Sequence, residues 1–380
     1  MTYPAKIDPY DELAKHLASN TYGWLDYVPE SGAFQKLLKE MFDEEEAGAL
    51  INIPVKPIPL EFVCFEEIAN KSNIPKEKLE KIFDRIADRG LLFSGTTKEG
   101  KKGYSFLKRG YGFPQIFCWK GEKNEKTMRF INLENDQDLK KSYAAMSNHG
   151  VNALKPWRYI PVTVSLDLQW QSVYPTEPIE KVIENAKRFA LANCPCRVRY
   201  ELDKGKSCGH STEVCIKLDE LADHLIRTGH GKEITREEAL QVIKKANKEG
   251  LVHFTENTAE DIKHICNCCG CACWNLVPIK KRIVPRDAIM AVYYIRETDV
   301  EKCTGCEICI DICPVDAIVI EEDIAKVDTN WCIGCGVCVL QCPEGAIKIR
   351  ERENKPLQTK NLSELYTKLD IQRSKKHNNN

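Results

Sequence analysis

The stretch Cys303-Thr-Gly-Cys306-Glu-Ile-Cys309-Ile-Asp-Ile-Cys313-Pro314 decides how the C-terminal part of this chain folds. It returns 29 positions later as Cys332-Ile-Gly-Cys335-Gly-Val-Cys338-Val-Leu-Gln-Cys342-Pro343. The pair Ala317-Ile318 recurs as Ala346-Ile347 at the same interval. A repeat that keeps both its cysteines and its apolar positions indicates two copies of one structural unit.

The spacing within each copy, C-x2-C-x2-C-x3-C-P, is the one that bacterial ferredoxins use to hold [4Fe–4S] clusters. In two-cluster ferredoxins the fourth cysteine of each run binds the other cluster. We therefore predict two [4Fe–4S] clusters as cofactors of a ferredoxin-like domain over residues 291–350. The predicted ligands are Cys303, Cys306, Cys309 and Cys342 for one cluster, and Cys332, Cys335, Cys338 and Cys313 for the other.

Composition limits the remaining possibilities. With 380 residues the chain has room for two or three domains, and its net charge of −1 gives no whole-chain attraction to nucleic acid or membranes. The longest apolar run, residues 288–295, is too short for a membrane span. The N-terminus has no apolar secretory segment, so we expect a cytoplasmic protein.

The cysteines are distributed unevenly. Of the 19 cysteines, 17 follow residue 193. Cytosolic thiols are kept reduced, so metal ligation explains this number better than disulfides do. We predict an N-terminal half that folds without metal and a C-terminal half that is built around it.

The N-terminal half contains a helix–turn–helix–hairpin pattern. Phe34, Leu37, Leu38, Met41 and Phe42 predict one buried helix face, and prolines then interrupt the chain. Over residues 53–110, two helices and two strands around a Gly- and Lys-rich turn resemble a winged helix. DNA binding is one interpretation, but the charges of residues 76–89 alternate in sign, which is typical of a solvated face. A protein-interaction or structural module is the alternative that we favour.

The first cysteine group of the middle region is spread over short loops. A helix that begins at Pro178, with Ile179, Val182, Ile183, Ala186 and Phe189 on one stripe, is predicted to run to Pro195 and end there. The candidate ligands that follow are Cys194, Cys196, Cys208 and Cys215. A spacer separates them from the second group, and Thr235 and Glu238 predict a capping box at the start of its helix.

The second group is denser and comprises Cys266, Cys268, Cys269, Cys271 and Cys273. Five cysteines in eight residues exceed the needs of one zinc ion, so we favour one or two further iron–sulfur clusters over zinc. Each group can hold its own cluster, or the two groups can mix and leave one thiolate as an open ligand. The sequence does not pair the ligands.

Other polar residues lie beside these cysteines. His210 and His264 are interpreted as residues that hydrogen-bond to ligands or lie on the surface, in preference to being ligands. Arg197 and Arg199 are either surface residues or cations that stabilise reduced clusters.

The chain resembles a family of iron–sulfur proteins from anaerobic bacteria and archaea that end in a dicluster ferredoxin domain. The resemblance rests on the motifs at residues 194–197, Cys208 and Cys215, and residues 234–239, 250–253 and 265–269, followed by the two ferredoxin runs. Residues 44–47 and 104–107 are also similar, so the resemblance covers most of residues 30–350. Ala272 departs from the family, which often has three adjacent cysteines there. The resemblance implies electron transfer in anaerobic metabolism.

The predicted fold class is a multidomain α+β protein. It comprises a helical segment (1–52), a winged-helix-like module (53–110), a connecting segment (111–177), a cysteine-rich metal domain (178–290), the ferredoxin-like domain (291–350) and a polar tail (351–380) expected to be disordered.

The predicted function is electron transfer. Low-potential electrons would pass through the C-terminal clusters to or from a further cysteine-ligated site and a partner redox enzyme. One alternative is an iron–sulfur oxidoreductase, or a subunit of one, with a catalytic cluster in the middle domain, although no nucleotide-binding fingerprint is present. The other is a redox-sensing winged-helix transcription regulator.

Overall fold

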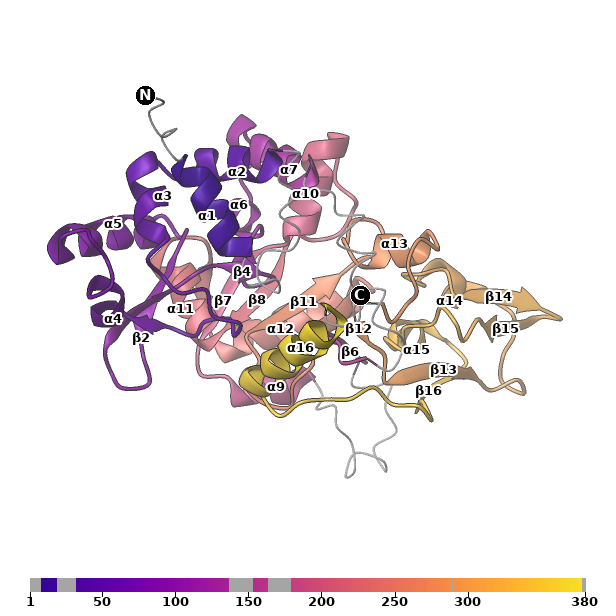
Figure 1. Ribbon diagram of the computed structural model, residues 1–380. Coiled ribbons are helices and arrows are strands. Elements are labelled where there is room, and N and C mark those ends of the chain that lie inside the picture. The colour runs from indigo at the N-terminus through magenta and orange to yellow at the C-terminus, as the bar shows by residue number, and fades with distance from the viewer. Residues whose placement is uncertain (1–7, 19–31, 137–152, 163–178, 289, 378–380) are drawn as a thin grey trace. The chain divides into compact units, whose positions relative to one another are not determined.

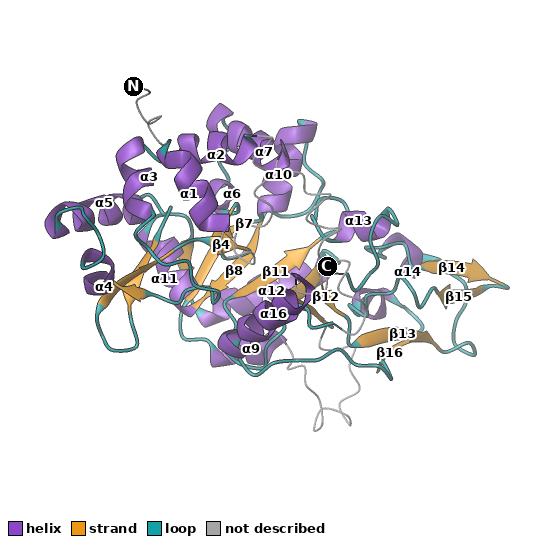
Figure 2. Ribbon diagram, viewed as in Figure 1, coloured by secondary structure: helices purple, strands orange, loops and turns teal. Residues whose placement is uncertain are grey.

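The computed structural model describes residues 8–18, 32–136, 153–162, 179–288 and 290–377. The chain forms two compact units, of which the first comprises residues 1–142 and 223–232, and the second residues 143–222 and 233–380. Both units contain helices and strands, so the predicted mixture of the two is confirmed (Figures 1 and 2).

The first unit begins with amphipathic helices. The five apolar residues predicted to share a helix face, from Phe34 to Phe42, are all buried. Asp43 and Glu46 form a capping box that starts the next helix. The helices of this part are α1 (Pro9–Ala18), α2 (Ala33–Met41), α3 (Glu44–Leu50), α6 (Ile116–Trp119) and α7 (Glu125–Asp136).

A small sheet completes the first unit. Strands β1 (Val63–Cys64), β3 (Lys102–Ser105) and β2 (Phe93–Thr96) pair antiparallel in that order, with helices α4 (Phe65–Ala69) and α5 (Lys76–Asp88) between β1 and β2 in the chain. Phe65, Phe83 and Tyr104 meet edge to face between helices and sheet. Two further short strands, β4 (Lys108–Arg109) and β5 (Gly112–Phe113), pair parallel, and the chain returns to this unit within α11 (Asp219–Arg227).

The second unit is built on a seven-stranded sheet. Its order is β12 (Met290–Ala291), β6 (Trp157–Ile160), β10 (Val252–Glu256), β11 (His264–Cys268), β8 (Glu213–Leu218), β7 (Phe189–Asn193) and β9 (Lys232–Ile234). Strand β12 is parallel to β6, whereas β6, β10, β11, β8 and β7 are antiparallel in succession. The segment predicted as a connection, residues 111–177, therefore contains packed elements where the structure describes it.

Helices α9 (Ile179–Asn185) and α12 (Arg236–Lys248) cover one face of this sheet. The predicted capping box of Thr235 and Glu238 is confirmed at the start of α12. Ile216 of β8 and Ile265 of β11 pack against the helices. Side chains alternate between the faces of a strand, so the cysteines that neighbour these isoleucines point to the opposite face. These are Cys215, Cys266 and, two residues further along β11, Cys268.

One boundary prediction is wrong. The helix that follows Pro178 ends at Asn185, and Phe189 begins strand β7. Pro195 does not end a helix but occupies the first turn of α10 (Pro195–Lys204), with Cys194 as its N-cap residue. Proline is tolerated at this position because the first helical N–H groups have no intrahelical partner.

The C-terminal part of the second unit contains two antiparallel pairs of strands. Strand β13 (Tyr294–Thr298) pairs with β16 (Ile347–Glu351), and β14 (Ile318–Glu321) with β15 (Ile324–Val327). The short helices α14 (Ile308–Asp311) and α15 (Val337–Gln341) follow equivalent positions of the two cysteine runs, and α13 (Leu276–Lys280) precedes them in the chain.

The expectation of a disordered tail is wrong for helix α16 (Leu362–His377). Leu362, Leu365, Tyr366 and Leu369 are buried, and their spacing is that of one helix face. The chain before α16 is held by Asn257, whose side-chain amide donates to the Leu357 carbonyl at 2.9 Å.

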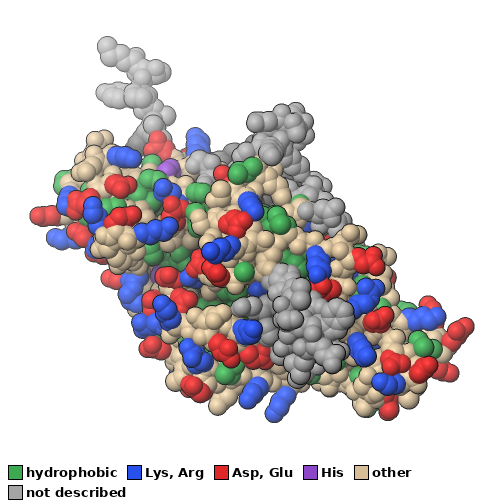
Figure 3. Space-filling model, turned by 90° about the horizontal axis from the view of Figure 1, so that it is seen from below, with side chains coloured by type: hydrophobic (Ala, Val, Ile, Leu, Met, Phe, Trp, Pro, Cys, Tyr) green, Lys and Arg blue, Asp and Glu red, His purple; other side chains and the backbone are tan. Residues whose placement is uncertain are grey.

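The described residues contain no helix long and apolar enough to cross a bilayer. On the face seen in Figure 3, acidic and basic side chains are interspersed. This agrees with the near-zero net charge of the sequence.

Candidate metal centres

The two cysteine runs adopt the same local backbone. Gly305 and Gly334 have φ values of +65° and +64°, a region that favours glycine. The amide N–H of Ala317 donates to Cys313 Sγ at 3.3 Å, and the equivalent N–H of Ala346 donates to Cys342 Sγ at the same distance. The repeat in the sequence is therefore a repeat in three dimensions.

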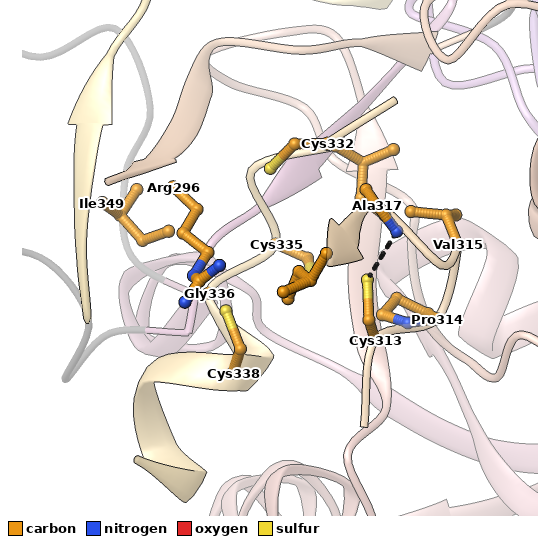
Figure 4. A pocket seen from close by; sticks show the side chains of 12 residues that line it. Arg296, Cys313, Pro314, Val315, Ala317, Cys332, Cys335, Gly336, Cys338 and Ile349 are labelled. Atoms are coloured by element: carbon orange, nitrogen blue, oxygen red, sulfur yellow. Dashed lines mark hydrogen bonds between the residues drawn. The ribbon is translucent and has the colours of Figure 1, made fainter. Parts of the chain in front are cut away.

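One cavity combines cysteines of both runs. Its lining includes Cys313 from the first run and Cys332, Cys335 and Cys338 from the second (Figure 4). This is the grouping that the ferredoxin spacing predicts for one cluster. Four thiols around one cavity, with a backbone N–H directed at Cys313 Sγ, fit a thiolate-ligated cluster.

The cysteines predicted for the other cluster are less enclosed. Cys309 is buried, Cys303 and Cys342 are half-buried, and Cys306 is exposed. Cys303, Cys309 and Cys342 belong to one packed group of side chains, and the amide N–H of Ala325 donates to Cys303 Sγ at 3.4 Å.

Arg296 lies beside cysteines of both predicted clusters. Its side chain is buried, lines the cavity of the second run and donates to Cys309 Sγ at 3.6 Å. Burial raises the pKa of the Cys338 thiol to about 12, and the charge of Arg296 opposes this shift. A buried cation here favours thiolates and other anionic groups in both places.

The middle cysteines separate into two groups, and each group mixes the two sequence clusters. The larger group is a chain of neighbouring thiols on the sheet face opposite α9 and α12 and on the loops beside it. Cys196 contacts Cys194 and Cys273, Cys268 contacts Cys273 and Cys266, and Cys266 contacts Cys215. We call Cys194, Cys196, Cys215, Cys266, Cys268 and Cys273 the six-thiol group.

The smaller group contains a histidine. The donor atoms of Cys208, His210, Cys269 and Cys271 all lie within 4.8 Å of one another. A hydrogen bond with Cys269 raises the pKa of the His210 imidazole to about 9, despite partial burial. His210 was interpreted as a residue beside the ligands, but the structure places its ring nitrogen among the candidate donors.

Buried cations flank the six-thiol group. Arg197 is fully buried, so its interpretation as a surface residue is wrong. Burial lowers the pKa of its guanidinium, but Cys194, Cys269 and Cys268 outweigh this and raise the pKa above its ordinary value. Burial likewise lowers the pKa of the Lys217 ammonium, but the neighbouring Cys215 and Cys266 outweigh this and raise it. Positive charges at these places favour several thiolates close together.

His264 is buried beside Cys266, and its Nδ1 lies 2.8 Å from Glu256 Oε1. A carboxylate paired with a histidine next to a ligand fixes the orientation of the ring. This position agrees with the prediction that His264 hydrogen-bonds beside the ligands.

Tyr159 interacts electrostatically with cysteines of both the six-thiol group and the cavity of the second run. It is fully enclosed, and burial raises the pKa of its phenol, with further contributions from Cys273, Cys268 and Cys335. The Asn275 side-chain amide donates to its hydroxyl at 2.6 Å. A second contact joins the same regions, because a Cβ on Gly270 would lie 2.2 Å from the Pro314 carbonyl oxygen.

Comparison with known proteins identifies the C-terminal part. Residues 302–347 match the 4Fe-4S dicluster domain family. A search of curated proteins and a search of solved structures each found no match. The chain thus contains a 4Fe-4S dicluster domain, and a cysteine-rich region precedes it.

Sequence reasoning missed Tyr159, Lys217 and Arg296. Nothing in a single sequence marks a tyrosine in a short strand or a lysine between two apolar residues as part of a metal centre. The only available signal was that Lys217 lies two residues after Cys215, on the same face of strand β8.

Proposed function

We propose that this protein transfers electrons through two [4Fe–4S] clusters in its C-terminal domain and a further iron–sulfur site at the six-thiol group. Cys303, Cys306, Cys309 and Cys342 hold the outer cluster, and Cys332, Cys335, Cys338 and Cys313 hold the inner one. When bound, such clusters supply reversible one-electron transfer. The observation that carries the proposal is the cavity lined by Cys313 together with the three cysteines of the second run.

The surroundings of the cysteines support a route by which electrons enter or leave the protein. The exposed Cys306 marks the place where a soluble redox partner exchanges electrons with the domain. Tyr159 and the contact of Gly270 with Pro314 connect the inner cluster to the cysteine-rich region through packed protein groups. Arg296 and Arg197 offset the negative charge that an added electron brings.

Metal and sulfide analysis of the anaerobically purified chain tests the proposal. We expect at least about eight iron atoms and as many sulfides per chain for the C-terminal clusters alone. Reduction should produce low-potential EPR signals. About two zinc atoms per chain, with no such signal, would refute the proposal.

The size of the six-thiol group favours a second candidate function. A [4Fe–4S] cluster needs four thiolates, and six neighbouring thiols exceed that number. We therefore consider a catalytic cluster of an oxidoreductase at this place. Full retention of every measured redox activity in Cys273→Ser would exclude it.

Within residues 53–110, the order of helices α4 and α5 and the sheet β1-β3-β2 supports the winged-helix interpretation of this module. DNA binding by α5 is not favoured, because Lys78 and Arg85 of this helix pair with acidic residues. Arg85 Nε lies 2.8 Å from Glu46 Oε1, and Lys78 Nζ lies 2.8 Å from Glu45 Oε1. A module that binds a protein partner suits this mixed charge better.

A further inference from the structure

We propose that Cys208, His210, Cys269 and Cys271 form a closed zinc site that is separate from the six-thiol group. The four residues come from the loop before β8 and the loop after β11. Cys269 is buried, Cys208 and His210 are half-buried, and Cys271 is exposed. Nothing in the proposed electron transfer depends on this site, because zinc has no redox chemistry.

The four donor atoms lie close enough together to bind one metal ion. His210 Nδ1 lies 3.7 Å from Cys208 Sγ and 3.5 Å from Cys271 Sγ, and Cys271 Sγ lies 3.1 Å from Cys269 Sγ. Ligands in a tetrahedron around zinc, at bond lengths of about 2.3 Å for sulfur and about 2.0 Å for nitrogen, are separated by about 3.5 Å for nitrogen and sulfur and by about 3.8 Å for two sulfurs. The two nitrogen–sulfur distances are close to this spacing, whereas Cys269 Sγ and Cys271 Sγ have to move apart by about 0.7 Å to bind one ion. A four-iron cluster holds its thiolates farther apart, because iron and sulfide lie between them.

The donor types point to the same ion. Three thiolates and one imidazole are a common ligand set of structural zinc sites, which leave no position open for substrate. Each pair of donors is only two residues apart in sequence, so the backbone must turn sharply between them. Gly209 provides such a turn with a φ of +89°.

The loop that carries Cys208 and His210 is held in place independently of metal. The Ser211 amide and hydroxyl donate to the Glu249 carboxylate at 2.8 and 2.5 Å. The Arg197 guanidinium donates to the Ser211 carbonyl at 2.7 Å. Donors on a preformed loop need little reorganisation to bind an ion.

The site has a structural role at the boundary with the ferredoxin-like domain. Gly270, between Cys269 and Cys271, packs against the Pro314 carbonyl, and Pro314 follows Cys313 of the inner cavity. One ion bound to both loops fixes this segment against the ferredoxin-like domain. Arg197 interacts with Cys269 on one side and with Cys194 on the other, and it reduces repulsion between the two anionic centres.

Element analysis of the full chain, purified anaerobically, tests the site. Wild type should contain one zinc ion per chain in addition to its iron. His210→Ala and Cys271→Ser should lose the zinc and keep the iron, whereas Cys196→Ser should lose iron and keep the zinc. Cys118→Ala, at a buried cysteine of the first unit, is the control and should keep both metals.

X-ray absorption at the zinc edge gives a second readout. We expect three sulfur ligands and one nitrogen ligand in wild type, and four sulfur ligands in His210→Cys. The His210→Cys variant keeps four donors, so it should retain zinc even where His210→Ala fails to fold. The site is refuted by wild type without zinc, by zinc bound to four sulfurs in wild type, or by His210→Ala that retains its zinc. Loss of iron from both His210 variants would refute its separation from the six-thiol group.

Discussion

The first and second cysteine runs share their spacing and backbone conformation but differ in what surrounds their thiols. Cys306 of the first run is exposed, whereas its counterpart Cys335 is buried. The second run is covered because the Val162 amide donates to the Cys335 carbonyl at 3.1 Å, and Arg286 donates to the Cys332 carbonyl. The rest of the second unit thus gives the two copies of one motif different environments.

This difference suggests distinct roles for equivalent residues. Thiols near the surface suit exchange with a partner, and enclosed thiols suit transfer within the protein. Substitutions at matched positions of the two runs test whether the clusters have these distinct roles.

The largest effect is expected for Cys335→Ser. Loss of this ligand should remove about four iron atoms and lower the free energy of unfolding by about 3 kcal/mol or more, because a buried cavity loses its contents. Cys306→Ser should also perturb one cluster but destabilise the fold less, since its position is exposed. Iron analysis and urea unfolding measure both. Equal losses of stability would contradict the distinction.

The next largest effect is expected for alanine substitutions at the equivalent glycines Gly334 and Gly305. A Cβ at position 334 would lie 2.2 Å from the carbonyl oxygen of the buried Tyr294, and one at position 305 would lie 2.6 Å from that of the exposed Asp323. Gly334→Ala should cost about 2–4 kcal/mol, and Gly305→Ala about 1–2 kcal/mol, because an exposed turn can move aside. The thermal unfolding midpoints of the two variants measure these losses of stability. A lower midpoint for Gly305→Ala than for Gly334→Ala would contradict the prediction.

A moderate effect is expected at Arg296, which contacts both sets of cysteines. Arg296→Gln should make both clusters harder to reduce, by about 1 kcal/mol or more, because a buried positive charge no longer offsets the added electron. Arg296→Lys keeps the charge and should restore most of the potential. EPR-monitored redox titration measures both signals. A change confined to one signal would show that Arg296 serves only one run.

The smallest effect is kinetic. On exposure to air, the EPR signal that Cys306→Ser abolishes should disappear several-fold faster than the signal that Cys335→Ser abolishes, because oxidant reaches an exposed thiolate first. Time-resolved EPR of the aerated wild type follows both signals. Equal rates would indicate that access does not distinguish the clusters.

Local patterns predicted the local features well. The capping box of Thr235 and Glu238 and the buried helix face around Leu37 were read correctly, because each depends on residues close in the chain. The tail was misjudged, although Leu362, Leu365, Tyr366 and Leu369 carry a helical spacing. Pro195 was misplaced because proline ends some helices and begins others, and only the strand before it decides between the two.

The sequence by itself identifies a ferredoxin-like domain, since two tandem C-x2-C-x2-C-x3-C-P runs, each supplying three cysteines to one cluster and its fourth to the other, are specific to this kind of domain. The division of the nine middle cysteines into two groups depends on tertiary contacts. Cys215 and Cys266 meet because two strands pair in one register, and His210 meets Cys271 because two loops end at the same place. Such contacts join residues far apart in the chain, and no local spacing encodes them.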